Sequence, residues 1–252
     1  FFHVMVEEAM VLPYKALKFN PHHIRAHQLL LMTLNYSLRD DSIIFKEYRK
    51  FDEQQMIPLA SLIRPRPHLN SRSPFERLKI GYVSGDFYKH SVAYFLQFLA
   101  HHNHTDFEIF CYHTQPHVDD ITKGVQEWID NWCQVEELSD DALAAKIRAD
   151  QIDILVDLSG HTNYNRLLTF ARKPAPIQIN YLGLPTTTGL RAIDYRLTDN
   201  YVDVAGLNDN LSAEEPLPMP GSLFCYQPHP QSPAINELPS LSTGQITFGC
   251  FN

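Results

Sequence analysis

The chain has 252 residues and a formal net charge of -8, with 44% hydrophobic and 12% aromatic residues. A soluble globular protein of one large or two modest domains fits this length and composition. The acidic balance argues against a nucleic-acid partner, which needs a concentrated basic surface. No apolar run reaches the roughly 20 residues that cross a bilayer, so no membrane association is expected.

The cysteines stand far apart and form no C-x-x-C pair. This spacing indicates ordinary thiols of a reducing, cytoplasmic compartment rather than a disulfide framework or a zinc site. The first residues contain Glu7 and Glu8, lack a basic region and do not start with Met. They predict an internal position in a longer protein rather than a signal peptide. The four cysteines are Cys111, Cys133, Cys225 and Cys250.

Residues 1–57 are helical in pattern. Small and apolar residues recur at helical spacing on both sides of Asn20-Pro21, which predicts a helix break there. The pattern resembles the end of a tetratricopeptide repeat, although an ordinary helical hairpin would look the same. A further amphipathic helix is expected over residues 42–57. Residues 58–75, with four prolines from Pro58 to Pro74, are expected to form a linker.

Residues 76–244 alternate between strand and helix patterns, which predicts an α/β lobe with a parallel sheet covered by helices. Ser139 is the expected N-cap of one of the helices, and Pro174 ends another. Residues 207–233 show no periodicity, and residues 245–252 are expected to begin a new strand of a second lobe. Strands are expected over residues 79–84, 107–113, 153–158, 177–182 and 195–198, and helices over 92–102, 119–130, 139–149 and 166–172.

Three polar loops follow strands of this lobe: residues 84–90, 159–162 and 183–189. Parallel strands with right-handed crossovers place such loops at the same edge of a sheet, where ligands bind. Asp86 and His90 lie four residues apart on the first loop, and an imidazole and a carboxylate at that spacing can handle protons or bind a polar ligand. Each histidine taken singly is more often structural than functional.

Several other chemistries lack their sequence signals. The chain has no G-x-G-x-x-G after its first strand, no P-loop and no G-x-S-x-G elbow. It also has no Asp-x-Asp, a frequent anchor for Mg²⁺ and a diphosphate. The run His101-His-Asn-His104 lies at an expected helix C-terminus, where partly charged imidazoles are favoured without a metal. We therefore expect no metal site and no cofactor.

Six ordered motifs resemble the catalytic region of the O-GlcNAc transferase and SPINDLY family, and the helical start resembles its last tetratricopeptide repeat. The resemblance covers nearly the whole chain. The motifs are Ile80-Gly-Tyr-Val-Ser-Gly-Asp-Phe with His90, Asp157-Leu-Ser-Gly-His-Thr162, Arg172-Lys-Pro-Ala-Pro-Ile-Gln178, Tyr181-Leu-Gly-Leu-Pro-Thr-Thr-Thr-Gly189, Asp194-Tyr-Arg-Leu-Thr-Asp199 and Phe224-Cys-Tyr226.

The resemblance implies a GT-B architecture of two Rossmann-like lobes, of which this chain holds the first. It also implies inverting, metal-independent transfer of a sugar from a nucleotide donor to Ser or Thr hydroxyls of proteins. His90 and Asp86 match the family's D-F-x-x-H loop and are the implied catalytic residues. The implied substrate-binding residues are Ser91, His161, Thr162, Leu182, Gly183 and Pro185.

Two departures from the family pattern bear on this assignment. Animal members have His-Pro-Thr where this chain has His90-Ser91-Val92, and a histidine that many relatives carry before the linker aligns with Gln55. The family's nucleotide-binding Lys and His residues lie past Asn252, so the resemblance implies half an active site and no activity of the chain alone. UDP-GlcNAc and GDP-fucose both stay open as donors, and a non-catalytic module that binds partner proteins is the alternative function.

Overall fold

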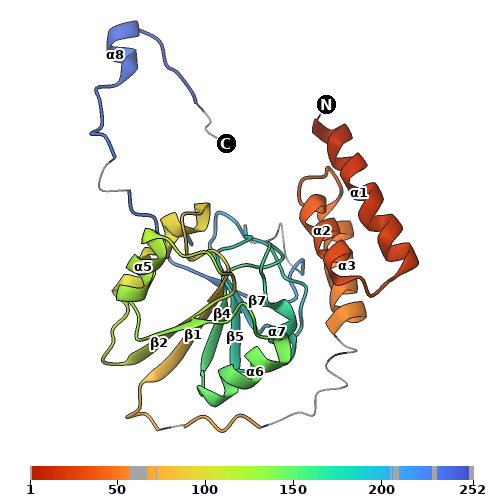
Figure 1. Ribbon diagram of the computed structural model, residues 1–252. Helices are drawn as coiled ribbons and strands as arrows, with labels where there is room; N and C mark the ends of the chain where they lie inside the picture. The colour runs from red at the N-terminus through yellow and green to blue at the C-terminus, as the bar shows by residue number, and fades with distance from the viewer. Residues whose placement is uncertain are drawn as a thin grey trace.

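The computed structural model describes residues 2–56, 59, 67–71, 73–204, 206, 210–228 and 232–249. Its centre is a seven-stranded sheet in which every neighbouring pair of strands is parallel, as the alternating sequence pattern predicts (Figure 1). The strand order is β3-β2-β1-β4-β5-β6-β7, the Rossmann-like order. The strands are β1 (Leu78–Ser84), β2 (Phe107–His113), β3 (Asn131–Gln134), β4 (Ile154–Asp157), β5 (Ile177–Asn180), β6 (Tyr195–Thr198) and β7 (Glu215–Pro218).

The order reverses between β1 and β4, because the chain first adds strands on one side of β1 and then crosses to the other. In open α/β sheets ligands bind in the crevice outside the carboxyl ends of the strands at this switch point. The fold therefore places the loops after β1 and β4 at the position where a ligand site is expected.

The two faces of the sheet have separate cores. Ile80 and Tyr82 of β1 pack into the core on one face and Val83 into the core on the other, the period of two that strands impose. One core lies under η2 (Ser91–His101) and α5 (Asp120–Glu127), and the other under α6 (Asp140–Ala149) and α7 (Leu167–Ala171). Figure 1 shows α5 and α6 on opposite sides of the strands.

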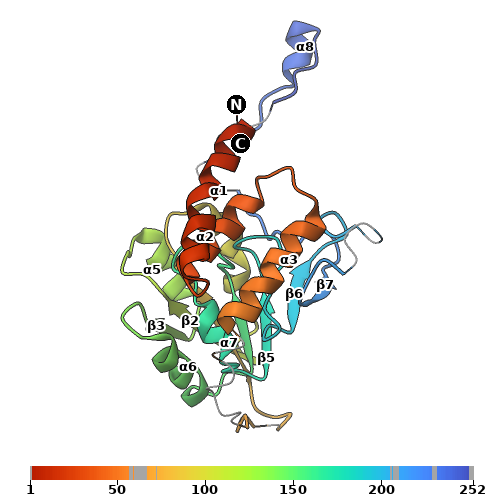
Figure 2. The ribbon, with the colours of Figure 1, turned by 90° about the vertical axis from the view of Figure 1, so that its right-hand side faces the viewer.

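The amino-terminal helices pack on the same face of the sheet as α7 (Figure 2). The break predicted at Asn20-Pro21 is confirmed, since one helix ends at Phe19 and the next starts at Ile24. Tyr48 and Phe51 are fully buried and belong to the same hydrophobic cluster as residues of the lobe. These elements are α1 (Phe2–Phe19), α2 (Ile24–Leu34), α3 (Asp41–Phe51) and η1 (Asp52–Met56).

Direct polar contacts also tie the helices to the lobe. Arg191 Nε donates to Asp52 Oδ2 at 2.7 Å, and Gln28 Nε2 donates to Asn165 Oδ1 at 2.9 Å. No helix among the described residues combines the length and the apolar character needed to cross a membrane.

Some expected elements differ from the structure. Residues 91–101 form a 3-10 helix, and the expected helix over 119–130 ends at Glu127 to make room for β3, which sequence reasoning missed. β3 was missed because it is short and only half-buried. β7 was missed because two of its four residues are prolines, which only an edge strand tolerates.

The expected strand at residues 245–252 is wrong for its described part. Residues 245–249 form no regular structure, and Ile246 and Phe248 are 78% and 93% exposed. Their apolar pattern fits a strand, but they pair with no strand among the described residues. A short helix, α8 (Pro239–Thr243), precedes them, and Figure 1 shows this segment extending away from the sheet. Of the expected linker, residues 58, 60–66 and 72 lie outside the described residues, and 67–71 have no regular structure.

Candidate functional site at the carboxyl edge of the sheet

The loop after β1 is built around a buried phenylalanine. Phe87 is fully buried, and its ring lies 5.9 Å from the His113 ring and 5.6 Å from the Trp132 ring. The Asp86 N–H donates to Ser84 Oγ at 2.9 Å, and the Lys89 N–H donates to Asp119 Oδ2 at 2.7 Å. The two predicted catalytic residues therefore stand on either side of a fixed anchor.

His90 and Asp86 approach each other without a direct hydrogen bond. His90 Nδ1 lies 3.8 Å from Asp86 Oδ1, and the same nitrogen accepts the Val92 N–H at 3.3 Å at the start of η2. The Asp86 side chain is 10% exposed and that of His90 38%. Burial raises the pKa of Asp86, and the charge of His90 opposes the shift. Ser91, the first residue of η2, is exposed.

The loop after β4 is held by a buried carboxylate. Asp157 is fully buried and accepts the N–H groups of Ser159 at 3.1 Å and Gly160 at 2.9 Å, together with the Asn180 amide at 2.9 Å. Burial raises the pKa of Asp157 to about 6, although these three hydrogen bonds favour the charged form. Asp157 and Asn180 end neighbouring strands, so the carboxylate joins the starts of two loops.

His161 lies between the lobe and the helices. The residue is 3% exposed, and its ring makes edge contacts with Tyr48 at 5.2 Å and Phe51 at 4.9 Å between ring centroids. His161 Nε2 lies 2.8 Å from the Thr188 carbonyl, which can only accept, so Nε2 carries the proton. Burial lowers the pKa of His161 to about 4. The ring is thus neutral and packs between the lobe and the helices. A role of His161 in substrate binding stays a prediction.

The loop after β5 contains a strained turn. Leu182 has φ 68°, in the left-handed region that a bulky side chain rarely adopts. Gly183 follows, and a Cβ at this position would lie 2.5 Å from the Leu158 carbonyl oxygen and 2.7 Å from the Ser159 backbone. Leu182 is held in the core by burial. Strain of this kind persists where the surroundings impose it, often at ligand sites.

The loops after β1 and β4 also touch. A Cβ on Gly85 would lie 2.7 Å from Tyr164 Cβ, and Thr114 Oγ1 donates to the Tyr164 carbonyl at 2.7 Å. Gln115 Nε2 donates to the Gly85 carbonyl. The loop of Asp86 therefore contacts the loop of Thr162, which in turn contacts the loop of Gly183. All three lie at one edge of the sheet, as the parallel topology predicts.

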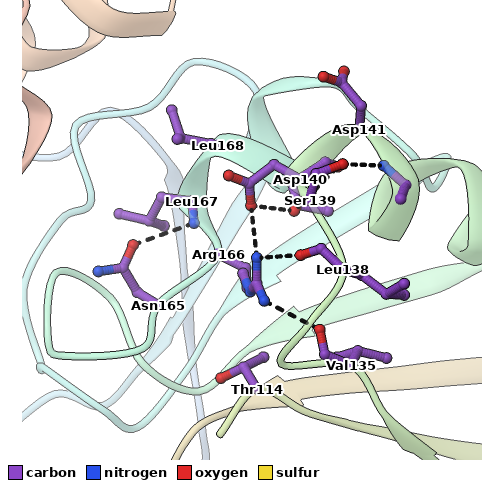
Figure 3. A network of polar contacts seen from close by, with 12 residues as sticks. Thr114, Val135, Leu138, Ser139, Asp140, Asp141, Asn165, Arg166, Leu167 and Leu168 are labelled. Carbon is purple, nitrogen blue, oxygen red and sulfur yellow. Dashed lines mark hydrogen bonds and ion pairs between the residues drawn. The ribbon is translucent and has the colours of Figure 1, made fainter.

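Arg166 fixes the far end of the loop after β4. Its guanidinium donates to the carbonyls of Leu138 at 2.9 Å and Val135 at 3.1 Å, and it lies 3.5 Å from Asp140 Oδ1 (Figure 3). Carbonyls of the loop between β3 and α6 thus satisfy a half-buried cation. The segment from Asp157 to Arg166 is anchored at both ends.

The predicted site residues border neighbouring cavities rather than one pocket. His90 lines a cavity of about 500 Å³ with Tyr94, Gln97 and Asp119. His161 and Thr162 line one of about 600 Å³ under α2, and Pro185 lines one of about 230 Å³ against α3. Thr162 Oγ1 donates to the Ser159 carbonyl at 2.8 Å. Asp86, Ser91, Leu182 and Gly183 line none of these three cavities.

Two histidines of the run at the end of η2 have partners within the protein. His102 Nε2 lies 2.9 Å from the Tyr82 hydroxyl, and His104 Nδ1 lies 2.9 Å from Asp130 Oδ2. Within the described part of the chain, no three His, Cys, Asp or Glu side chains gather as metal ligands would.

Sequence reasoning missed two polar residues of this edge. Asn180 binds Asp157, and Glu214 accepts hydrogen bonds from Thr187 and Thr188 in the loop after β5. A signal existed for Asn180, because it is a polar residue at the carboxyl end of a strand, the edge where ligands bind in open α/β sheets. No sequence signal pointed to Glu214, because it lies in a stretch without hydrophobic periodicity.

Comparison with known proteins assigns the family. A profile of the family described as glycosyl transferase family 41 matches residues 62–228. The chain is 34% identical over 242 residues to a probable UDP-N-acetylglucosamine–peptide N-acetylglucosaminyltransferase SPINDLY of Solanum lycopersicum, covering 94% of this chain and 26% of that protein. A similarly named protein, SEC of Arabidopsis thaliana, is 39% identical over 130 residues, covering 51% of this chain and 13% of that protein.

A solved structure shows the same fold. A mutant of the O-GlcNAc transferase of Thermobaculum terrenum superposes with a TM-score of 0.85 at 34% identity, over 92% of this chain and 44% of that one. The chain thus spans about a quarter of the length of the SPINDLY relatives. With the fold, the motif-bearing loops and the profile in agreement, the chain belongs to glycosyl transferase family 41.

Proposed function

We propose that this chain forms one wall of the active site of an inverting, metal-independent protein O-glycosyltransferase. The observation that carries the proposal is the contact between the loops of Asp86, Thr162 and Gly183 at the switch point of a family 41 chain. The SPINDLY and SEC relatives are named for transfer from UDP-N-acetylglucosamine to peptides, so UDP-GlcNAc is the donor we propose. GDP-fucose is the alternative.

The reaction requires three things of the protein. The acceptor hydroxyl attacks the anomeric carbon, the bond from that carbon to the diphosphate oxygen breaks with its electron pair leaving on the diphosphate, and the hydroxyl proton moves to a base. Positioning of the hydroxyl, a proton acceptor and hydrogen-bond donors for the diphosphate are therefore needed. Because the diphosphate leaves as a stable anion, donors from the protein can replace a metal and no cofactor is required.

The geometry of His90 suits one of these tasks directly. Since Nδ1 accepts the Val92 N–H, the proton of the neutral ring belongs on Nε2. Nε2–H is then a donor for a sugar or phosphate oxygen. To accept a proton, Nδ1 must give up the Val92 N–H, and the Asp86 carboxylate 3.8 Å away would stabilise the resulting imidazolium. We propose that His90 and Asp86 act as this pair.

The remaining predicted residues would shape the substrate pockets. We propose that Leu182, Gly183 and Pro185 line the sugar pocket, and that Ser91, His161 and Thr162 border the acceptor side, His161 through its neighbours because its own ring is buried. The partners would be protein acceptors and a nucleotide sugar. The described cysteines, Cys111, Cys133 and Cys225, are free thiols, which supports a cytoplasmic setting.

The chain spans about a quarter of its SPINDLY relatives, so we propose that turnover needs segments beyond these 252 residues. The test incubates a Ser- and Thr-containing peptide with UDP-GlcNAc or GDP-fucose and the complete protein that carries this chain, and reads the peptide mass. We expect the GlcNAc adduct with the complete protein and no adduct with the 252 residues alone. An unmodified peptide with both donors would refute the transferase assignment.

The variant His90→Ala tests the catalytic pair. Loss of a group that handles a proton and binds the donor is expected to lower kcat by about 10²–10⁴-fold. His101→Ala is the matched control, because this histidine is exposed at the end of η2. Binding of acceptor proteins should persist in His90→Ala. A His90→Ala protein with unchanged kcat would contradict the proposed role. If neither wild type nor His90→Ala turns over while both bind acceptor proteins, the binding-module alternative is favoured.

A further inference from the structure

Glu214 is a buried carboxylate whose hydrogen-bond donors are all neutral. It is 3% exposed and lies just before β7. Its Oε2 accepts the Thr187 hydroxyl at 2.6 Å and the Ser212 hydroxyl at 2.9 Å, and its Oε1 accepts the Thr188 N–H at 2.8 Å and the Thr188 hydroxyl. A buried charge is costly unless hydrogen bonds satisfy it, and four donors converge here to do so.

The hydroxyls that donate to Glu214 in turn order the backbone. Because Thr187 donates its own proton to Glu214, its oxygen is free to accept the N–H groups of Gly189 at 3.0 Å and Ala213 at 3.1 Å. Thr188 Oγ1 likewise accepts the Leu190 N–H at 3.2 Å. The carboxylate therefore sets the direction of the Thr187 and Thr188 hydroxyls.

The turn held by Glu214 meets both neighbouring parts of the molecule. The Thr188 carbonyl accepts the His161 ring N–H, which belongs to the loop after β4. A Cβ on Gly189 would lie 2.5 Å from the Tyr48 carbonyl oxygen of α3. On the other side, the chain leads back through Thr186 and Pro185 to the strained Leu182–Gly183 turn. The turn thus connects Glu214 to the loop after β4, to α3 and, along the chain, to the Leu182–Gly183 turn.

We propose that Glu214 is a positioning residue for sugar transfer: it holds residues 186–189, and through them the turn at Leu182–Pro185, in the shape that receives the donor sugar. This inference rests on the proposed function. Burial is the main cause of the raised pKa values of Asp157 and Tyr48, and the negative charge of Glu214 adds a smaller contribution to both.

The variant Glu214→Gln keeps the shape and removes the charge. An amide oxygen can accept the Thr188 N–H, but the amide NH₂ then faces the Thr187 oxygen, which already accepts two N–H groups. We expect amide hydrogen exchange over residues 183–190 of the 252-residue chain to quicken at least tenfold, and exchange in α5 to stay as in wild type. Glu215→Gln is the matched control, because Glu215 is the adjacent residue and is exposed.

Two further readouts separate positioning from general stability. The pKa of Asp157, followed by NMR, should fall below its value of about 6 in Glu214→Gln and not in Glu215→Gln. In the complete protein, kcat should fall about tenfold or more while KM for the acceptor stays within twofold. Unchanged exchange over residues 183–190, or wild-type kcat with the turn loosened, would overturn the inference. If Glu214→Gln does not fold, Thr188→Val replaces it, with Thr188→Ser expected to restore wild-type exchange.

The outcomes distinguish this inference from the proposed function. If the wild-type complete protein transfers no sugar, the proposed function fails, while the exchange and pKa measurements still decide whether Glu214 orders the turn. If the wild type is active and Glu214→Gln is as active as Glu215→Gln, only the positioning role fails.

Discussion

At the scale of single residues, His161 makes stability depend on pH. Its pKa in the folded chain is about 4, below the ordinary value of 6.5, because burial favours the neutral ring. The stability that it contributes is therefore fully present above pH 6.5 and is lost as the pH falls toward 4. The difference of about 2.5 pKa units corresponds to about 3 kcal/mol.

The measurement compares wild type with His161→Gln, whose amide can still donate to the Thr188 carbonyl. The advantage of wild type in free energy of unfolding should shrink between pH 6.5 and pH 4. The two proteins are compared at each pH because Asp157 changes the stability of both in the opposite direction. The fold favours the protonated form of Asp157, whose pKa is raised, and that contribution to stability is lost as pH rises through about 6. If the advantage of wild type over His161→Gln in free energy of unfolding did not change with pH, the His161 ring would not be buried in its neutral form. His101→Gln, at an exposed histidine, is the control.

At the scale of elements, the loops after β4 and β5 approach too closely for a side chain. Gly183→Ala would place a Cβ 2.5 Å from backbone atoms that cannot rotate away. We expect it to lower the free energy of unfolding by about 1–3 kcal/mol, as overpacking does, and to lower kcat in the complete protein.

Gly124→Ala is the matched control for this substitution. Gly124 lies in α5, and its added Cβ would meet no atom within 4 Å. Since alanine favours helix over glycine by roughly 1 kcal/mol, this variant should be stabilised. Urea denaturation of both proteins checks the signs. Equal effects of the two substitutions would show that the close approach of the two loops does not exist in solution.

At the scale of the whole molecule, the helices and the lobe share one core. Phe51 of α3 contacts the His161 ring of the lobe, and Asp52 pairs with Arg191. We expect Phe51→Ala to destabilise the chain by about 3–5 kcal/mol and to leave a single unfolding transition. Phe19→Ala, at a side chain that is 92% exposed, should have little effect.

Two probes of unfolding check this prediction. Far-ultraviolet circular dichroism follows all helices, and most of the described α-helical residues lie in α1, α2 and α3. Fluorescence of Trp132 and Trp128 follows the lobe alone. The two midpoints should coincide in wild type and move together in Phe51→Ala. Separate midpoints in wild type would mean that the helices and the lobe fold independently, and the shared core would then contribute little.

Much of the fold followed from local sequence patterns. β2 and β6 have the bounds that alternation predicts, and Ser139 caps α6 as expected. These elements have strong periodicity or a defined capping residue, so neighbouring residues suffice to specify them. The short edge strands β3 and β7 were missed, because four residues of mixed polarity become a strand only when a neighbouring strand supplies the hydrogen bonds.

For the candidate site, the sequence alone determined which loops carry the polar residues and that parallel topology brings them to one edge. It could not decide that the His161 ring faces the helices, that Gly183 lies against Ser159, or that Glu214 reaches the loop after β5. Those facts depend on contacts between residues far apart in the chain. Such contacts leave no local pattern, because a buried carboxylate or histidine is selected by the donors, acceptors and rings that the folded chain places around it.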